Sequence, residues 1–374
     1  MGNKNLRSAS VSASASKTDE VENWVQHPRV AGVDSHSFYL PPELNADRPP
    51  ERRGLVRDQV RLLVLNRKTG ATEHSRFDRL GDFLRPKDLL VFNSSRTLPA
   101  ALIASGPQFD VEVRLAERLP DGSWMALLTG TQKENRIVPE LLLDFGLDLT
   151  ATVISQDARI PAFWRLRFSK SGTDFLDRLY RLGEPIRYRY LSSPWSLSYY
   201  QNVYGHRPGG SEMPSAGRAF SWRLLFELRR KGVDTASVTL HAGLSSYLDD
   251  GLDRQHIASE EEYWISEATA KKIRRARKSG GRLIAIGTTV VRALESMAQQ
   301  GDISAQHAYT RLRITAGYRL QLSDGLLTGL HEPEASHLDL LAAFVPSVTI
   351  QRAYAEAIEQ HYLWHEFGDV NLIM

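Results

Sequence analysis

The sequence of 374 residues contains no cysteine, and it lacks the phosphate-binding, dinucleotide-binding and G-x-S-x-G motifs that identify many enzymes. The absence of cysteine excludes a disulfide scaffold, thiolate catalysis and cysteine-ligated zinc or iron–sulfur sites. No window approaches the ~20 apolar residues of a membrane-spanning helix, so no contact with a membrane is expected. The acidic clusters lack the spacing of metal ligands, so no metal site is expected either. This composition fits a cytoplasmic protein.

A marked excess of one charge is also missing. Lys and Arg number 47 against 44 Asp and Glu, which gives a net charge of +3. This balance permits RNA binding but does not argue for it, because many enzymes of small-molecule metabolism have similar values. Hydrophobic residues make up 42% of the chain, as in a globular protein with a substantial core.

Composition and periodicity divide the chain into three parts. The first residues, to about Lys17, are rich in Ser and Ala and lack the apolar centre of a signal peptide, so we expect a disordered tail over residues 1–30. Residues 98–172 contain short runs of period two and a hairpin turn at Pro120-Asp-Gly122, which predict a small β-barrel. Residues 31–97 and 173–374 alternate strands and helices. The sequence therefore predicts an α/β domain, with a mostly parallel sheet and crossover helices, into which the barrel is inserted.

Two helices of this α/β domain have clear start and stop signals. Ser221 is expected to cap a helix from Trp222 to Lys231, which Gly232 ends. Ser266 is expected to cap the next helix, which ends at Gly280-Gly281.

The turn Gly287-Thr288-Thr289 connects an apolar strand to a helix that carries Arg292. One interpretation is a clamp for a polar ligand, made by backbone N–H groups, two hydroxyls and a guanidinium at a helix N-terminus. The other is an ordinary tight turn whose threonines cap the helix.

Two histidines follow apolar runs. His241 ends a strand, and His331 follows Leu326-Leu-Thr-Gly-Leu330. Catalytic groups gather at the edge of a parallel sheet, and histidine transfers protons near neutral pH. A structural histidine with satisfied hydrogen bonds is the alternative for each.

Basic and aromatic residues suggest contacts with nucleic acid at two places, each with a plainer alternative. One is a face of a helix, which a solvated surface also explains. The other interleaves cations with aromatic rings, as a base-stacking surface or an ordinary half-buried strand would. The first set is Lys271, Arg274, Arg275 and Lys278, and the second spans Arg187-Tyr-Arg-Tyr190 and Trp195 to Tyr200.

Short motifs follow one another along the chain, each at one place, between Leu40 and Ile373. They are Leu40-Pro-Pro-Glu-Leu44, Val91-Phe-Asn-Ser-Ser-Arg96, Tyr200-Gln-Asn-Val-Tyr204, Pro214-Ser-Ala-Gly217, Thr239-Leu-His-Ala-Gly243, Ile286-Gly-Thr-Thr289 with Arg292 and Glu295, Gly317-Tyr-Arg319, Asp324 with Leu326-Leu-Thr328, His331 with Pro333, and Gly368-Asp369. In this order they resemble the S-adenosylmethionine:tRNA ribosyltransferase-isomerase family of queuosine biosynthesis, of which the chain looks like a divergent member.

The resemblance implies a reaction. The family moves and isomerises the ribosyl group of S-adenosylmethionine onto 7-aminomethyl-7-deazaguanine in tRNA, which gives epoxyqueuosine and releases adenine and methionine. It implies S-adenosylmethionine as cosubstrate, tRNA as a partner beside this small molecule, and no metal. A monomer is expected.

The resemblance also implies site residues. His241 and His331 match family histidines and are the candidates for proton transfer. The candidates for substrate binding match other family positions: Asn93, Arg96, Gly217, Arg218, Gly243, Thr288, Thr289, Arg292, Tyr318, Asp324 and Asp369.

Several motifs depart from the family pattern. Pro214-Ser-Ala-Gly-Arg-Ala-Phe220 has Arg218 and Ala219 where the family has Leu and His, and Gln255-His-Ile-Ala-Ser-Glu260 lacks two further family histidines. These changes suggest a paralogue with an altered acceptor or altered chemistry, and Arg218 favours an anionic group on the substrate. The alternatives are the same donor with a small-molecule acceptor, or a non-catalytic ligand-binding homologue. Salt-dependent RNA binding would distinguish a tRNA acceptor from a small molecule.

Overall fold

The computed structural model describes residues 38–106, 110–130, 137–188, 190–191, 193–244, 260–333 and 335–374. These residues all fall within one compact unit, His36–Met374. The predicted tail at residues 1–30 and the divergent segment at residues 255–258 lie outside the described residues.

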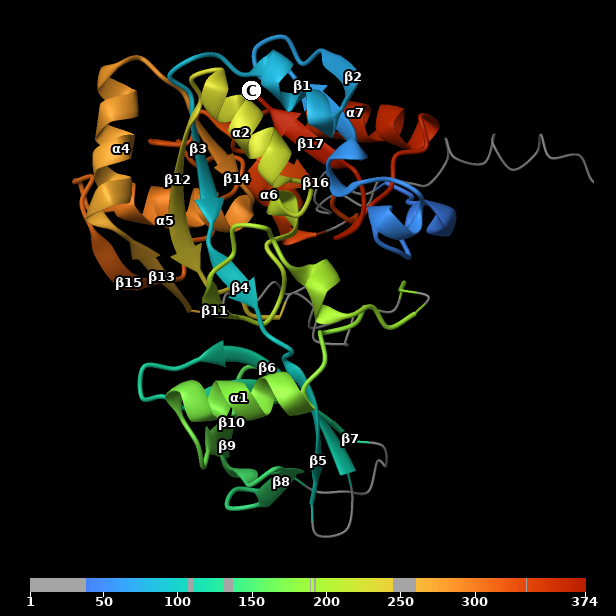
Figure 1. The fold of residues 1–374 in the computed structure, drawn as a ribbon, viewed down its shortest axis with the longest axis vertical. Helices are drawn as coiled ribbons and strands as arrows, with labels where there is room; N and C mark the ends of the chain where they lie inside the picture. The colour runs from blue at the N-terminus through green and yellow to red at the C-terminus, as the bar shows by residue number, and fades with distance from the viewer. Residues whose placement is uncertain are drawn as a thin grey trace, which may run out of the picture. The chain divides into compact units, whose positions relative to one another are not determined.

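A mixed sheet forms the larger domain (Figure 1). Its strands are β1 (Arg61–Leu65), β2 (Thr72–Arg76), β3 (Leu89–Asn93), β12 (Asp234–Leu240), β13 (Glu261–Ile265), β14 (Leu283–Ile286), β15 (Gln306–Thr310), β16 (Gly325–Gly329) and β17 (Val370–Ile373). Within the described residues the sheet has nine strands in the order β15-β13-β12-β3-β14-β16-β17-β1-β2. The central strands β12, β3, β14 and β16 are parallel, and antiparallel strands pair at both ends. The predicted fold class is confirmed.

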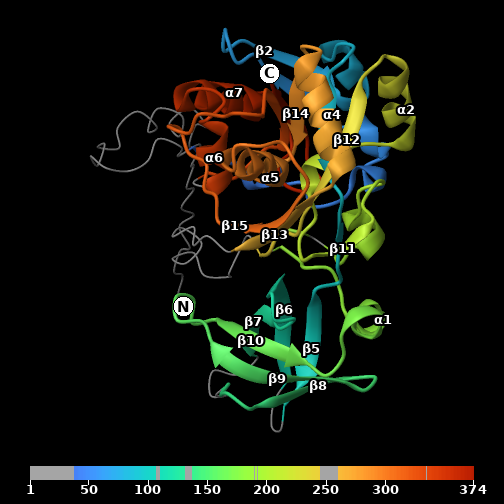
Figure 2. The ribbon, with the colours of Figure 1, turned by 90° about the vertical axis from the view of Figure 1, so that its left-hand side faces the viewer.

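Helices cover both faces of this sheet. They are α2 (Trp222–Arg230), α4 (Glu267–Lys278), α5 (Thr288–Gln299), α6 (Ser336–Leu341) and α7 (Ser347–Glu359). The buried residues of α4 to α7 form one core with the first face, and those of α2 form a second core with the other face. Figure 2 shows α2 on the side of the sheet away from α5 and α7.

Short 3₁₀ helices connect these elements. They are η2 (Pro42–Leu44), η3 (Pro50–Arg52), η4 (Arg57–Gln59), η5 (Phe77–Phe83), η6 (Leu197–Tyr200) and η7 (Ser215–Gly217).

Both predicted helix caps are confirmed. Ser221 Oγ accepts a hydrogen bond from the N–H of Leu224 at the start of α2. Ser266 Oγ accepts one from the N–H of Thr269 at the start of α4. Each hydroxyl satisfies an N–H that has no partner within the helix.

The inserted segment is a closed antiparallel barrel. Its strands are β5 (Ala101–Ser105), β6 (Asp110–Arg118), β7 (Trp124–Gly130), β8 (Leu142–Gly146), β9 (Leu149–Gln156) and β10 (Phe163–Phe168). Buried and exposed residues alternate along β5, β8 and β9, because successive side chains of a strand point to opposite faces. Helix α1 (Gly172–Leu182) contributes Phe175 and Leu179 to the barrel's core, which continues to Ile186. The segment that shares this core therefore extends past the expected boundary at residue 172.

The chain enters the barrel through β4 (Ser95–Thr97), which pairs in parallel with β11 (Arg207–Gly210) after the return. In the part of the chain that the structure describes, no helix is long and apolar enough to cross a membrane.

Candidate active site

Polar side chains gather at one edge of the sheet. Strands β12, β3, β14 and β16 run in the same direction, so their carboxyl ends share that edge. His241, Asn93, Gly287 and Gly329 stand at these four ends. Strand β17 runs antiparallel to β16 and begins at the same edge, immediately after Asp369. Ligands of open α/β sheets bind outside the carboxyl ends of the strands.

His241 follows the last residue of β12 at this edge. Its Nδ1 is 2.9 Å from Oγ of Ser95. On the other side of the ring, a Cβ atom on Gly209 would lie 2.5 Å from Nε2. The glycine of β11 therefore leaves the space that the imidazole occupies, and Ser95 fixes the orientation of the ring.

The surroundings of His241 keep its ring neutral. Burial, together with the positive charges of Arg207 and Arg118, lowers the pKa of His241 to about 4. The Trp264 indole packs edge-on against the imidazole, with the ring centroids 5.2 Å apart. At pH 7 this histidine is deprotonated and has the lone pair that a general base needs.

Asn93, at the end of β3, forms hydrogen bonds with β4, β12 and α5. Its Oδ1 accepts hydrogen bonds from the N–H groups of Ser95 and Leu240, at 3.0 and 3.1 Å. Its Nδ2 donates to the Leu240 carbonyl at 2.8 Å and to Oγ1 of Thr289 at 3.1 Å. The buried amide thus aligns the residue before His241 with the start of α5.

The start of α5 has the geometry of the predicted polar turn. Gly287 adopts φ 97°, a conformation that favours glycine, and Thr288 and Thr289 open the helix. Arg292 donates from Nε to the Leu312 carbonyl at 2.9 Å, and its Nη1 forms an ion pair with the largely buried Glu261. This arginine holds the first residue of β13 rather than pointing freely into solvent.

Gly217 and Arg218 pack beside this turn. A Cβ atom on Gly217 would lie 1.7 Å from the hydroxyl oxygen of Tyr204, so only glycine fits there. Arg218 is 2% exposed. Its Nε donates to the Tyr199 carbonyl at 2.9 Å and its Nη2 to Glu51 at 2.7 Å.

His331 and Asp369 lie beyond the end of β16. His331 Nε2 is 2.7 Å from Oγ1 of Thr328, and burial lowers its pKa well below the ordinary value. Asp369 accepts a hydrogen bond from the N–H of Arg61 at 2.7 Å and pairs with the same residue's guanidinium at 3.1 Å. Asp369 thereby joins β17 to β1.

Arg96 and Gly243 are also near this edge. Arg96, in β4, donates from Nη1 to the Gly205 carbonyl at 3.3 Å. Gly243 follows His241 by two residues and is buried.

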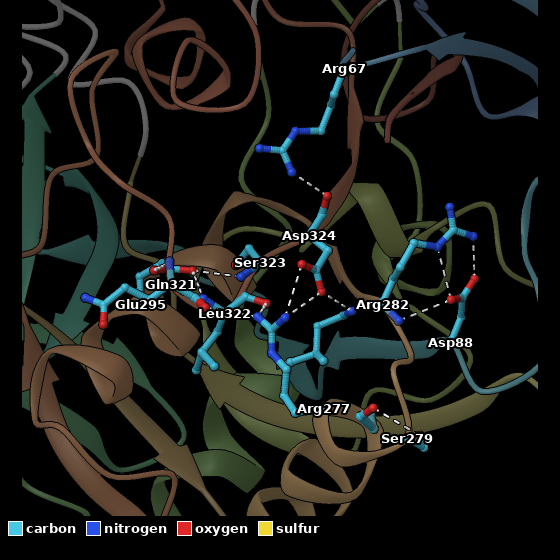
Figure 3. Close-up of polar contacts among 12 residues, drawn as sticks. Arg67, Asp88, Arg277, Ser279, Arg282, Glu295, Gln321, Leu322, Ser323 and Asp324 are labelled. Carbon is cyan, nitrogen blue, oxygen red and sulfur yellow. Dashed lines mark hydrogen bonds and ion pairs between the residues drawn. The ribbon is translucent and has the colours of Figure 1, made fainter.

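Asp324 and Tyr318 are placed elsewhere. Asp324 precedes β16, so it lies at the amino edge of the parallel strands, where it pairs with Arg277 at 3.1 Å and accepts from the N–H of Leu283 (Figure 3). The Tyr318 hydroxyl is 3.5 Å from Nε2 of Gln299, at the end of α5 far from Thr288. The structure does not bring these two residues together with His241.

Four residues at the edge were not among the sequence candidates. Ser95 and Gly209 shape the position of His241, and Glu261 holds Arg292. Glu366 borders a recess beside Arg218. Ser95 belongs to the motif that contains Asn93, and this is the one sequence signal that pointed to any of the four. The described residues contain no group of three or more His, Asp or Glu side chains positioned to hold a metal ion.

The fold and this edge define a class: an α/β protein with an inserted β-barrel and a neutral histidine at the carboxyl ends of its parallel strands. A family model for queuosine biosynthesis proteins matches residues 33–373. The chain belongs to this family, and the resemblance predicted from its motifs is confirmed.

Relatives of known name support the assignment. The chain is 36% identical over 346 residues to an S-adenosylmethionine:tRNA ribosyltransferase-isomerase from Carboxydothermus hydrogenoformans, which covers 90% of this chain and 98% of the relative. A protein of the same name from Thermotoga maritima is 35% identical over 350 residues, covering 91% and 99%. The crystal structure of the S-adenosylmethionine tRNA ribosyltransferase from Thermotoga maritima aligns with a TM-score of 0.52 and 30% identity, over 91% of this chain and 100% of that one.

Proposed function

We propose that this protein transfers and isomerises the ribosyl group of S-adenosylmethionine onto 7-aminomethyl-7-deazaguanine in tRNA, giving epoxyqueuosine. The relatives that carry the name of this activity share about a third of its residues and cover some nine-tenths of its length, which supports the proposal. The cosubstrate is S-adenosylmethionine, the acceptor is tRNA, and adenine and methionine are the other products.

The chemistry requires a base of modest strength. The positively charged sulfonium of S-adenosylmethionine acidifies the hydrogens on the adjacent ribose carbon, so a neutral imidazole is sufficient to remove one. Adenine leaves more easily when a general acid protonates it. We assign the base to His241. His331, the other candidate for proton transfer, is on the same edge of the sheet, but burial keeps its imidazole neutral, so it is not assigned as the acid that protonates adenine.

The observation that carries this proposal is the state of His241. The imidazole is neutral because it is buried, is oriented through Nδ1 by Ser95, and stands at the carboxyl end of β12. When Nδ1–H donates to the Ser95 hydroxyl, Nε2 keeps its lone pair in the plane of the ring, and Gly209 packs over the face of the ring at its Nε2 end. Among the described residues, only Ser95 forms a hydrogen bond with this imidazole, whereas a structural histidine would be expected to use both ring nitrogens.

Mass spectrometry tests the reaction directly. The protein is incubated with S-adenosylmethionine, with and without tRNA that bears 7-aminomethyl-7-deazaguanine. We expect release of adenine and formation of epoxyqueuosine in the tRNA, and neither without tRNA. A His241→Asn variant, which keeps a polar side chain but loses the base, is expected to bind both substrates and to form little product.

Two results would contradict the proposal. Turnover of S-adenosylmethionine that needs a small-molecule amine instead of tRNA would assign a different acceptor. Absence of product in a protein that still binds both substrates would make it a ligand-binding homologue.

Binding of tRNA should weaken steeply with salt, because each Lys or Arg on a phosphate displaces condensed counterions.

A further inference from the structure

The outer face of α2 carries two large aromatic side chains that no described element covers (Figure 2). Trp222 is 54% exposed and Phe226 is 52% exposed. Their rings stack on each other, with the centroids 6.1 Å apart and 29° between the ring planes. Both lie on the side of the helix opposite Leu224 and Leu228, which fill the core. Exposed apolar side chains that gather in one place, unlike scattered ones, mark contact sites.

Positive charge accompanies the two rings. The segment Trp222–Lys231 contains four cations and one acid, so it alone has as large an excess of positive charge as the whole chain, +3. Its acid, Glu227, already pairs with Arg223 at 3.0 Å. Arg229 and Arg230 are exposed, and neither forms an ion pair with any residue that the structure describes. The end of α2 therefore attracts an anionic partner.

Two further cations lie close to this end of α2. Lys87 is exposed, and its N–H donates to the carbonyl of Gly232, in the turn after α2, at 2.9 Å. A Cβ atom on Gly281 would lie 2.0 Å from the Lys87 carbonyl oxygen, and the exposed Lys278 precedes this glycine by three residues. The turns that lead into β12, β3 and β14 are therefore side by side. No described carboxylate forms an ion pair with either lysine, so both add to the positive charge.

Helix α2 connects the edge of the candidate active site with this basic end. Ser221, which caps α2, donates a hydrogen bond to Asp58, three residues before β1. Strand β1 is parallel to β17 and hence antiparallel to β16, so it begins at the edge where the central strands end. Trp222 is therefore at the active-site end of the helix. Arg229 and Arg230 follow about two helical turns later, towards the opposite edge.

Aromatic rings combined with unpaired cations match a nucleic acid better than a second copy of this chain. Bases stack on aromatic side chains, and phosphates bind Lys and Arg. A two-fold contact between copies through α2 would instead bring the four cations of one helix against the same four of the other. The charge on this face opposes such a dimer and favours RNA.

We propose that the outer face of α2 binds the acceptor tRNA. An unpaired base stacks on Trp222 and Phe226, and phosphates of the same strand contact Arg229 and Arg230. The inference rests on the proposed function, because that function makes tRNA the acceptor. The face holds the tRNA beside the active-site edge and does not touch the reacting atoms.

Two double variants test the two halves of this surface. Fluorescence anisotropy measures the Kd for tRNA bearing 7-aminomethyl-7-deazaguanine at a series of salt concentrations. Trp222→Ala/Phe226→Ala should weaken binding by about 10- to 100-fold without changing its salt dependence, because a stacked base is lost and no charge is removed. Arg229→Gln/Arg230→Gln should weaken binding by about tenfold at physiological salt. It should also reduce the slope of log Kd against log salt by about 1.5, because two contacts that release counterions are lost.

Matched substitutions on another exposed helix provide the control. Helix α1 carries an exposed ring at Tyr180 and an exposed cation at Arg181. Tyr180→Ala/Arg181→Gln should leave the Kd for tRNA within about twofold of the wild type. An equal loss in this variant would overturn the assignment to α2. All variants should keep the wild-type affinity for S-adenosylhomocysteine, measured by calorimetry, which shows that the fold and the donor site are intact.

The outcomes separate this proposal from the function on which it rests. A wild type that forms product, together with α2 variants that bind tRNA equally tightly, would overturn the α2 surface and leave the function intact. A wild type that binds no tRNA would remove the acceptor and the surface with it. A wild-type dimer that Trp222→Ala/Phe226→Ala converts to a monomer, with unchanged affinity for tRNA, would assign this face to a second copy of the chain instead.

Discussion

His241 is neutral because it is buried, and this state predicts the pH dependence of the reaction. Its pKa is about 4, so the proposed base remains deprotonated down to about pH 5. We expect kcat/KM to show no fall near pH 6.5, where an exposed histidine would titrate, and to decline only below about pH 5. His241→Asn should lower kcat by about 10²- to 10⁴-fold, the usual contribution of a general base. Steady-state kinetics of adenine release at different pH values measure both effects.

His307 offers a matched control for this variant. It stacks on the other side of the same tryptophan, Trp264, with centroids 4.7 Å apart, and it is exposed. His307→Asn should keep kcat and the pH profile of the wild type. An equal loss in both variants would mean that disturbance of Trp264, rather than removal of a base, explains the effect.

Gly209 predicts a second effect on the proposed base, His241. A Cβ atom there would lie 2.5 to 2.7 Å from three atoms of the His241 ring, so Gly209→Ala must displace the imidazole. Because misplacement of a catalytic group by about 1 Å costs up to 10²-fold, we expect kcat to fall by at least about tenfold. Gly317→Ala is the control, since a Cβ atom on Gly317 meets nothing within 4 Å. Wild-type kcat in Gly209→Ala would show that the ring position is not critical.

The sequence located His241 and the Thr288 turn because each directly follows an apolar strand, which is local information. The same rule, applied to Asp324, indicates the opposite edge: this residue precedes β16 instead of following it. The resemblance alone had grouped it with the substrate-binding residues. Glu366 could not be predicted, because its unpaired state depends on what surrounds it in space.

At the scale of elements, α5 is coupled to the segment before β16 through one buried carboxylate. Glu295 is fully buried and accepts hydrogen bonds from the N–H groups of Gln321, Leu322 and Ser323, at 2.7, 3.0 and 2.9 Å (Figure 3). Glu295→Gln removes the charge and turns an N–H₂ group toward these donors. We expect the free energy of unfolding to fall by about 2–4 kcal/mol, measured by urea denaturation.

Glu227, which is exposed on α2 and pairs with Arg223, is the control for this loss. Glu227→Gln should change the free energy of unfolding by less than about 0.5 kcal/mol. A similarly small effect of Glu295→Gln would show that the segment from Gln321 to Ser323 is held by other contacts.

Elements with local signals were predictable, and their arrangement was not. The helix caps Ser221 and Ser266 follow from patterns within a few residues. In the barrel, runs of period two indicate strands, but no such run marks the short strands β5 and β8. The antiparallel insertion of β17 between β16 and β1 depends on pairing over some 300 residues, which no local pattern contains.

At the scale of the whole molecule, two groups of buried side chains determine how the free energy of unfolding depends on pH. Their contributions change in opposite directions as the pH falls. Burial lowers the pKa of His241 and His365 to about 4, and it lowers that of His331 as well. As the pH falls from 6.5, these histidines become protonated in the unfolded chain but not in the folded protein. The free energy of unfolding therefore decreases. Burial raises the pKa of Glu117 and Glu366 to about 7. Between pH 7 and 4.5 the folded state holds protons on these carboxyls that the unfolded chain releases, so this contribution increases as the pH falls.

The two contributions partly cancel in the wild type, and the double variant Glu117→Gln/Glu366→Gln removes one of them. At pH 7.5 the wild type bears the cost of two ionised, shielded carboxylates, whereas the variant does not. We therefore expect the variant to be more stable by about 1–3 kcal/mol at pH 7.5, less than the pKa shifts alone imply because both side chains are partly exposed. At pH 4.5 the difference should vanish, and the variant should lose stability more steeply between these values. Urea denaturation at intervals of half a pH unit measures this, and a variant less stable than the wild type at pH 7.5 would mean that both carboxylates have cationic partners in solution.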